Sequence, residues 1–432
     1  VENQQVRGGL AELGGEIEGE AVRFPPEVVE ELIDGSERPN PPQATPTVRS
    51  VAGVSVGRVL DPQTGHYEPW TEPAFAEYVK LAHHLEHVQG ASLLGCPFDY
   101  PHALHPLYQR LVCYRHGARS GGSLWDARLL PFIEEMTAVI AQARSVPFGS
   151  EWNAAVYLQS PLKFGSVEAE HFAWCTERGY SCAVGHMMAA GATGPATIAG
   201  SVALFLAEHL FIALLRRAFY GDRRLRLHCS VSVLDMHGGI HAYGAPERPL
   251  ANMMMAQMAR HYGVPFSGHG GATDAKAPSV EAGAQKVLTC LPILLCGGSA
   301  SISAGRLSSD EVYSPLQMVI DNELVGCLKR FAAGVEVSGE TLAVDVIREV
   351  GPGGQFLDAE HTAEWFRREH WLPEVFTRQS LASWMQGDRR TDIDRAREVY
   401  DRLMALPDPP RGDPAVIEKL QRVIDRAAEA VA

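Results

Sequence analysis

The sequence has no dense run of lysine and arginine and no paired-cysteine motif, and both absences exclude classes of protein. It carries 38 Lys and Arg against 52 Asp and Glu, a net charge of -14, so we expect no nucleic-acid partner, because such proteins usually present a basic patch. None of the eight cysteines forms a CxxC pair, which argues against a structural zinc site or a disulfide framework. Residues 1–20 lack an apolar signal-peptide stretch, so we expect a cytoplasmic protein with free thiols.

The sequence also lacks the phosphate loops GxGxxG and GxxxxGK[ST] and the zinc motif HExxH. The missing loops count against a doubly wound nucleotide-binding sheet. Because no carboxylate–histidine cluster has a hydrolase-like spacing either, we expect no protein-held metal. The most apolar stretch, Val202–Leu215, contains Glu208 and His209 and is too short to cross a bilayer, so we expect no membrane association.

Strand-like runs alternate with long helical stretches through the middle of the chain. The predicted strands are Val88–Leu94, Leu111–Arg115, Ala154–Gln159, Ser181–Met187, Leu225–Val233, Val264–Gly268 and Ala300–Ser303. The predicted helices between them include Trp125–Arg144, Glu168–Glu177, Thr197–Tyr220, Pro249–His261 and Ser279–Leu295. This alternation indicates repeated βαβ units in an α/β protein, and its length favours a TIM-type (β/α)8 barrel. For the eighth strand, Gly334–Val337 is one candidate.

We predict three parts along the chain. Residues 1–70 would form an N-terminal helix, a Pro-rich linker from Pro39 to Pro46 and a small β appendage. Residues 71–359 would form the barrel, beginning with a helix that Thr71 caps. Residues 360–432 would form a helical C-terminal extension, in which Asp392–Met404 and Pro414–Ala432 are the clearest amphipathic pieces.

In a barrel of this kind, catalytic and binding residues gather at the carboxyl ends of the strands. Five polar side chains stand at or just after predicted strand ends: Gln159, His186, Asp235, His269 and Arg306. A single histidine there is more often structural than functional, but several at successive strand ends favour a shared pocket. Asp274 and Lys276 follow His269 in a glycine-rich loop, where we expect them to form an ion pair that fixes the loop.

Several stretches, in order along the chain, resemble motifs of the trimethylamine methyltransferase family. They are Ser160-Pro161-Leu162, Ala189–Gly200 (AAGATGPATIAG), Asp235-Met236, Gly270–Pro278 (GGATDAKAP) with Glu281-Ala282-Gly283, Val319–Glu323 (VIDNE), and Glu349–Leu357 with His361-Thr362. The similarity runs from about residue 50 to residue 405. It implies an α/β barrel enzyme that moves a methyl group from a methylated amine to a corrinoid protein.

The resemblance also bears on the substrate. Family members that act on trimethylamine carry pyrrolysine, which this sequence does not contain, so the chain looks like the members that act on quaternary amines such as glycine betaine. A quaternary ammonium that loses a methyl group leaves a neutral amine, so no general acid is required, and Co(I) of the corrinoid supplies the nucleophile. Two departures concern the substrate more than the fold: Leu316 replaces a family Glu, and the loop after Met236 runs His-Gly-Gly-Ile-His.

We therefore predict a methyltransferase whose corrinoid (cobalamin) is carried by a separate protein, because the chain has no DxHxxG cobalamin loop; we also expect a homo-oligomer. The predicted substrate-binding residues are Gln159, His186, Asp235, His269, Arg306 and His361. Arg306 would pair with a betaine carboxylate, although a structural salt bridge is an equal alternative. Two other functions stay open: a barrel that binds a quaternary amine without methyl transfer, and a corrinoid-free lyase using His269 and Lys276 as acid and base.

Overall fold

The structure, a computed structural model, describes residues 1–38, 46–122 and 124–431. Residues 39–45 of the predicted Pro-rich linker therefore lie outside the described residues. The chain begins with helix α1 (Gln4–Glu12), the hairpin strands β1 (Glu16–Glu18) and β2 (Ala21–Arg23), and helix α2 (Pro26–Asp34). Val6 and Leu10 of α1 are fully buried, so this N-terminal part packs on the rest of the protein.

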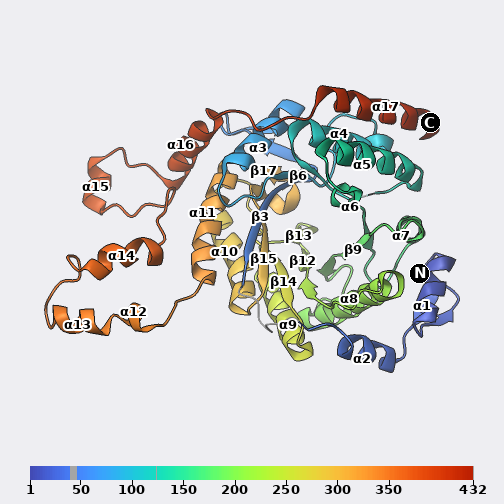
Figure 1. Ribbon diagram of the computed structural model, residues 1–432, viewed down its shortest axis with the longest axis horizontal. Helices are drawn as coiled ribbons and strands as arrows, with labels where there is room; N and C mark the ends of the chain where they lie inside the picture. Colours follow the sequence, from blue (N-terminus) through green and yellow to red (C-terminus); the bar gives the residue numbers. More distant parts are fainter. Residues whose placement is uncertain (39–45, 123, 432) are drawn as a thin grey trace.

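A parallel sheet forms the centre of the molecule, which confirms the predicted α/β class (Figure 1). Its six strands lie in the order β11 (Leu227–Cys229), β14 (Phe266–Gly270), β15 (Ser299–Ser303), β3 (Val48–Val54), β6 (Ala91–Leu93) and β7 (Arg119–Ser120). Every neighbouring pair in this sheet is parallel. The carboxyl ends of all six strands therefore meet at one edge of the sheet.

Two smaller parallel pairings continue this arrangement. Strand β8 (Ala155–Leu158) pairs with β9 (Ala183–His186), and β10 (Met188–Ala190) pairs with β12 (Val231–Asp235), which also carries antiparallel β13 (Ile240–Ala242). The amide of Ala155 donates to the carbonyl of Gly122, just after β7, at 2.8 Å. A separate four-stranded sheet contains β4 (Arg58–Leu60), β5 (Tyr67–Pro69), β16 (Arg306–Leu307) and β17 (Val312–Tyr313).

Helices surround the strands (Figure 1). They are α3 (Glu72–His84), α4 (His105–His116), α5 (Leu130–Arg144), α6 (Phe148–Glu151), α7 (Ser166–Glu177), α8 (Ile198–Tyr220), α9 (Glu247–Tyr262), α10 (Val280–Leu295) and α11 (Pro315–Ala332). Helix α3 begins as the sequence predicts: the Thr71 hydroxyl accepts from the amide of Ala74 at 3.2 Å. Its Phe75 and Tyr78 lie in the core that lines this side of the sheet.

Helix α8 is long and apolar enough to cross a membrane by length and composition. In this structure its side chains pack instead against two hydrophobic cores, through Phe205 in one and Leu214 and Leu215 in the other. Glu208 and His209 are buried on the same helix and hydrogen-bonded to other elements. A buried, partnered carboxylate is typical of a core helix rather than of one facing lipid.

Three strand predictions need correction. Leu111–Arg115 is not a strand but part of α4, which ends at Gly117 in a left-handed conformation (φ 73°). Gly334–Val337 forms no strand, and Val335 and Val337 are exposed. Residues 48–54, which we assigned to a small β appendage, form β3 in the middle of the sheet, between β15 and β6. The sheet therefore starts before the predicted boundary at residue 71.

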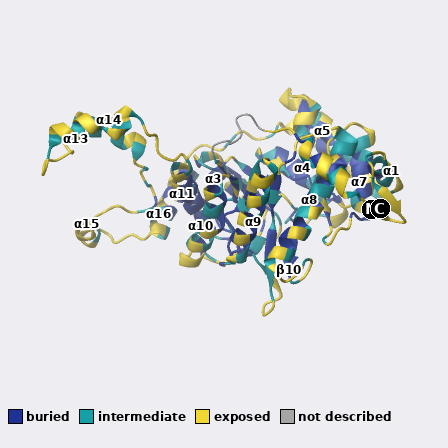
Figure 2. Cartoon of the chain, turned by 90° about the horizontal axis from the view of Figure 1, so that it is seen from below, coloured by how far each residue is buried: buried dark blue, intermediate teal, exposed yellow. Residues whose placement is uncertain are grey.

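The C-terminal part is helical, as predicted, and it divides in two. Helices α12 (Gly339–Leu342), α13 (Val344–Val350), α14 (Glu360–Glu369) and α15 (Leu381–Gln386) contain no buried residues. Figure 2 shows α13, α14 and α15 extending from the body of the molecule. Helix α16 (Asp392–Met404) packs on α11 and α3, and α17 (Pro414–Val431) packs on α5 and α4. The last two helices are thus part of the main body.

Candidate active site

The loops that follow β14 and β15 meet at the carboxyl edge of the sheet. Strands β14 and β15 are direct neighbours, with His269 opposite Ser301. The guanidinium of Arg306 contacts His269 Nε2, and the hydroxyl oxygen of Ser301 lies 3.2 Å from His269 Nδ1. Of the six predicted substrate-binding residues, His269 and Arg306 are the two that the structure places in contact with each other.

The charges around His269 fix its protonation. Burial lowers the pKa of His269 well below its ordinary value, and the nearby Arg306 and Arg248 guanidinium groups lower it further. The ring is therefore neutral at pH 7. Because Arg306 has only donors, the Nε2 atom of His269 accepts and its Nδ1 carries the hydrogen toward Ser301. Arg306 Nη1 also pairs with Asp310 Oδ1 at 2.6 Å.

Asp274 joins three loops at this edge. Its carboxylate accepts from the amides of Tyr243 and Gly244 at 2.7 and 2.9 Å and from the hydroxyl of Ser309 at 2.7 Å. Lys276 is exposed, and its Nζ donates to the backbone carbonyl of Asp274 at 2.8 Å. The ion pair expected between the two side chains is thus replaced by bonds from Asp274 to backbone amides and a hydroxyl.

The loop that supplies Asp310 is strained. Ser308, Ser309 and Asp310 all have left-handed backbone conformations, with φ of 48°, 50° and 90°. The amides of Ser308 and Ser309 donate to carbonyls of the loop after β14, at 2.9 and 3.1 Å. Non-glycine residues in this region are uncommon and cluster at functional sites. The loop is therefore held in place by the neighbouring loop, together with the ion pair to Arg306.

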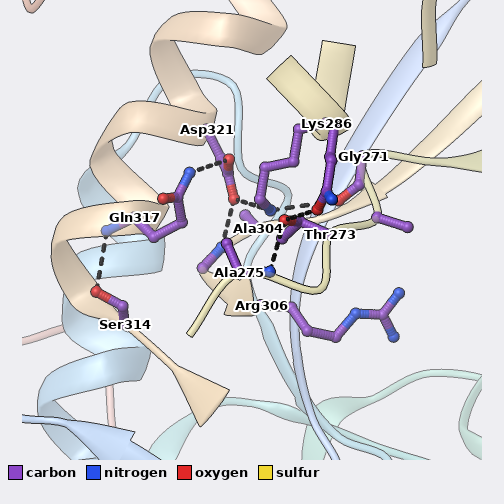
Figure 3. Close-up of polar contacts among 12 residues, drawn as sticks. Gly271, Thr273, Ala275, Lys286, Ala304, Arg306, Ser314, Gln317 and Asp321 are labelled. Atoms are coloured by element: carbon purple, nitrogen blue, oxygen red, sulfur yellow. Dashed lines mark hydrogen bonds and ion pairs between the residues drawn. The ribbon is translucent and has the colours of Figure 1, made fainter. Parts of the chain in front are cut away.

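The buried ion pair between Lys286 and Asp321 holds the turn before Arg306 in position (Figure 3). Lys286 Nζ of α10 donates to Asp321 Oδ2 of α11 at 2.8 Å, and the amide of Gly305 donates to the same oxygen at 2.8 Å. Gln317 Nε2 donates to the other carboxylate oxygen, also at 2.8 Å. Burial lowers the pKa of Lys286, and the nearby Asp321 opposes this shift. The carboxylate thereby locks the residue before Arg306 to two helices.

Gly305 cannot be replaced without disturbing this arrangement. It has a positive φ of 77°, and a Cβ at this position would collide with the hydroxyl of Tyr78. That hydroxyl donates to the carbonyl of Ala304 at 3.0 Å. The turn after β15 therefore requires glycine both for its conformation and for space. Figure 3 shows the Arg306 side chain leaving this turn on the side away from Asp321.

The other two polar residues of the VIDNE stretch also act as tethers. Asn322 Oδ1 accepts from the amide of His87 at 2.7 Å. Glu323 Oε1 accepts from three successive amides, those of Glu374, Val375 and Phe376, at 2.9 to 3.0 Å. One carboxylate thus holds the segment between α14 and α15 against α11. The family motif contributes to the structure around the site, which the sequence alone did not reveal.

His186 lies in a buried polar cluster that shares no hydrogen bond with the His269–Arg306 pair among the described residues. Its Nδ1 is 3.2 Å from Glu208 Oε2 and its Nε2 is 3.3 Å from His209 Nδ1. Glu208 also accepts from the Ser160 hydroxyl and the Leu162 amide. His186, His209 and His228 each bring one nitrogen to within 4.8 Å of the others. In the sequence, Glu208 and His209 stand out only as polar interruptions of an apolar stretch.

The remaining predicted residues are separate from one another. Gln159 is exposed after β8 and donates to Glu168 at 3.1 Å. Asp235, at the end of β12, accepts from the amide of Gly238 at 2.7 Å and closes its own turn. His361 lies on exposed α14, where its Nε2 is 3.3 Å from the carbonyl of Glu340 and its ring stacks on Trp365. The structure thus places His361 apart from the His269–Arg306 pair, on a helix that extends from the body of the molecule (Figure 2).

Comparisons with a family model and with individual proteins both point to methyltransferases. The family described as trimethylamine methyltransferase (MTTB) matches residues 1–432. Glycine betaine methyltransferase of Desulfitobacterium hafniense (strain Y51) is 30% identical over 273 residues, 63% of this chain and 57% of that protein. Trimethylamine methyltransferase MttB2 of Methanosarcina mazei is 29% identical over 244 residues, 56% of this chain and 49% of that protein. Thus the chain spans about half the length of these curated relatives.

A third relative aligns over more of its length. Trimethylamine methyltransferase MttB of Desulfitobacterium hafniense (strain DSM 10664 / DCB-2) is 24% identical over 356 residues, which is 80% of this chain and 69% of that protein. The named relatives are methyltransferases, and their names include both trimethylamine and glycine betaine as substrates.

Proposed function

The chain belongs to the trimethylamine methyltransferase family, and from this premise we propose that it transfers a methyl group from a quaternary amine of the glycine betaine type to the Co(I) corrinoid of a separate carrier protein. The observation that carries the choice of substrate is the Arg306 guanidinium at the carboxyl edge of the sheet, in contact with neutral His269. It offers a positive, directional partner for a carboxylate.

The reaction breaks one N–CH3 bond and forms one Co–CH3 bond. The pair of electrons from the broken bond stays on nitrogen, so a quaternary ammonium leaves as a neutral tertiary amine and no proton is needed. The corrinoid of the carrier supplies the nucleophile. The chain's own task is to hold the N–CH3 axis in line with the entering cobalt and to exclude water.

Arg306 would recognise the carboxylate by exchanging partners. Its Nη1 is paired with Asp310 at 2.6 Å, and only 11% of its side chain is exposed. A bound betaine carboxylate would replace Asp310, which then becomes free to face the positive ammonium group. His269 would keep the guanidinium in plane by accepting from its other nitrogen. The strained loop of residues 308–310 and the hydrogen bonds of Asp274 hold the side chains of Arg306 and Asp310 in position before the substrate binds.

We further propose that the parallel strands close into one (β/α)8 barrel. The pairing of β15 with β3 joins the last strand of the series to the first. The bond from Ala155 to Gly122 joins β8 to the end of β7, and the β10–β12 pair joins the continuations of β9 and β11. These contacts support a ring of eight strand positions, with His269 and Arg306 at its carboxyl rim.

Two further proposals concern the setting of the reaction. All eight cysteines are free, which supports a reducing, cytoplasmic environment. The exposed apolar side chains of the α12–α14 region, such as Leu342, Ile347 and Leu357, support a homo-oligomer. Size-exclusion chromatography with light scattering checks the second proposal, because a monomer mass at micromolar concentration contradicts it.

The direct experiment mixes the purified chain with a cognate corrinoid protein in the Co(I) state and glycine betaine. We expect the spectrum to change to that of methyl-Co(III) at a rate that depends on the chain. Binding of the betaine without any spectral change would instead select a binding protein. Turnover of the betaine without added corrinoid protein would select a lyase, for which the exposed Lys276, hydrogen-bonded to Asp274, gives little support.

A further inference from the structure

Three histidines from three elements converge where the parallel pairing of the strands is interrupted. His186 ends β9, His228 lies in β11 and His209 lies in α8, where its ring contacts the rings of both other histidines. Within the described residues β9 pairs with β8 and β11 with β14, while β9 and β11 have no strand ladder between them. The three ring nitrogens that face one another all lie within 4.8 Å. His186 and His209 are 2% and 8% exposed, and His228 is partly buried.

The outward nitrogens of two of these rings are held by acceptors. His186 Nδ1 faces Glu208 Oε2 at 3.2 Å, and His209 Nε2 faces the carbonyl of Arg226 at 2.6 Å. Both outward nitrogens therefore carry hydrogens. Bonds of this kind, to a carboxylate or a backbone carbonyl, are what orients a metal-binding histidine and fixes its tautomer. Glu208 is itself held by the Ser160 hydroxyl at 2.8 Å and the Leu162 amide at 2.9 Å.

Because the outward nitrogens of His186 and His209 carry the hydrogens, the inward nitrogens of these two rings present lone pairs to each other. If both rings are neutral, His186 Nε2 and His209 Nδ1 face one another as acceptors across 3.3 Å. His228 adds a third nitrogen and makes no side-chain hydrogen bond among the described residues. Glu208 is fully buried, and its partners in the described part of the chain include no Lys or Arg. The cluster thus needs one cation, which is either a shared proton or a metal ion.

We propose that this cation is a divalent transition metal of the zinc class, bound by His186, His209 and His228. The 3.3 Å separation of two donor atoms matches the edge of a tetrahedron with metal–nitrogen bonds of about 2.0–2.1 Å. Three neutral imidazoles suit such an ion, and three protein ligands leave a fourth position for water or another small ligand. The negatively charged Glu208 carboxylate accepts from the far nitrogen of His186 and would partly balance the charge of the ion.

The proposal departs from the sequence-based expectation of no protein-held metal. The ligands come from positions 186, 209 and 228, a spacing of about 20 residues that matches no short motif. Only the fold brings them together, by placing α8 against the break between β9 and β11. Bound metal would join α8 to both strands at this break, independently of whether the chain transfers methyl groups.

The test is a Co2+ titration of the full-length chain after removal of metals with a chelator. We expect the visible absorption of four-coordinate Co2+ to saturate at one equivalent and to disappear when Zn2+ is added. We expect His228→Ala to weaken binding at least about 100-fold, and Glu208→Gln, which keeps the side chain's shape, to weaken it about 10- to 100-fold. His102→Ala is the matched control, because exposed His102 and partly buried His105 form a second histidine pair, with rings 5.0 Å apart.

Several outcomes would overturn the proposal. If the wild-type chain gives no four-coordinate spectrum at one equivalent, the cation is a proton shared by His186 and His209. If His102→Ala abolishes binding, the metal lies at the His102–His105 pair. If His228→Ala binds Co2+ as the wild type does while its circular dichroism is unchanged, the three histidines are not the ligands. If His228→Ala does not fold, a wild-type chain without a four-coordinate spectrum still overturns the proposal, and Glu208→Gln that binds as the wild type does counts against the site.

Discussion

Arg306 is the residue on which substrate choice depends in this account. Replacing it with alanine removes a charge-assisted hydrogen bond to the carboxylate, so we predict that Arg306→Ala lowers kcat/KM for glycine betaine about 10- to 100-fold. Affinity for tetramethylammonium, which has no carboxylate, should stay within about twofold when measured by calorimetry. Arg260→Ala, at an exposed position on α9, is the control. Full activity of Arg306→Ala on the betaine would remove Arg306 from the site.

The Lys286–Asp321 pair supplies a second prediction at the residue scale. Both side chains are almost completely buried, at 2% and 1% exposed. Lys286→Met leaves a buried carboxylate without its cation, so it should cost about 4 kcal/mol of unfolding free energy in urea. Adding Asp321→Asn should restore at least about 1 kcal/mol, because the amide is uncharged. A double variant no more stable than Lys286→Met would show that the uncompensated charge is not the cause.

At the residue scale, part of the candidate active site could be predicted from the sequence. The contact between His269 and Arg306 was accessible because both residues follow strands predicted to be parallel, and such strands end at one edge. Glu208, Lys286 and Asp321 were given no role in the site, because they lie on helices and act through partners on other elements. A carboxylate inside an apolar stretch, as Glu208 is within Val202–Leu215, is a signal that could have pointed to the buried role of that residue.

At the scale of elements, the start of α3 carries a pH-dependent tether. Hydrogen bonds from His116, Tyr100 and Arg115 lower the pKa of Glu72 to about 2. Glu72 in its charged form therefore stabilises the fold above about pH 4.5, and this stabilisation is lost as the pH falls toward 2. We predict that Glu72→Gln costs about 2 kcal/mol at pH 7, allowing for the side chain's partial exposure.

The same difference should shrink as unfolding is measured from pH 5 down toward pH 3. The exposed Glu77 on the same helix provides the comparison, since Glu77→Gln should change stability by less than about 0.5 kcal/mol at every pH. A Glu72→Gln penalty that stays constant down to pH 3 would contradict the role of the charged carboxylate.

Two secondary-structure predictions failed because the local sequence pattern did not reveal how the segment is buried or paired. Helix α4 buries Gln109 through Tyr114 without a break, so it lacks the polar face that marks a surface helix, and its apolar run was mistaken for a strand. Strand β3 pairs with β15, about 250 residues later, and no local pattern gives such a partner. Six of the seven predicted strands overlap strands of the structure, because short β-branched runs between long helices are a strong signal.

At the scale of the whole molecule, the burial of the thiols makes a simple prediction. Six of the eight cysteines are buried, while Cys296 is partly exposed and Cys327 is exposed. Burial also raises the pKa of thiols such as Cys96, to about 11, and Cys290, to about 12. We predict that a thiol reagent modifies no more than two cysteines in the native chain at pH 7.5 and all eight in denaturant.

Cys327→Ser should lower the native count by one. Rapid modification of three or more thiols in the native chain would contradict the burial of the cysteines. A count below eight in denaturant without reductant would contradict the absence of disulfides among the described cysteines.

The central claim is that the chain moves a methyl group from a quaternary amine to a corrinoid protein. The most direct measurement uses glycine betaine with 13C-labelled methyl groups, the chain and a Co(I) corrinoid protein, followed by NMR and mass spectrometry. The account predicts dimethylglycine and 13C-methyl corrinoid in equal amounts, both dependent on the chain. Betaine recovered unchanged while it binds the chain, or dimethylglycine formed without label on the corrinoid, would contradict it.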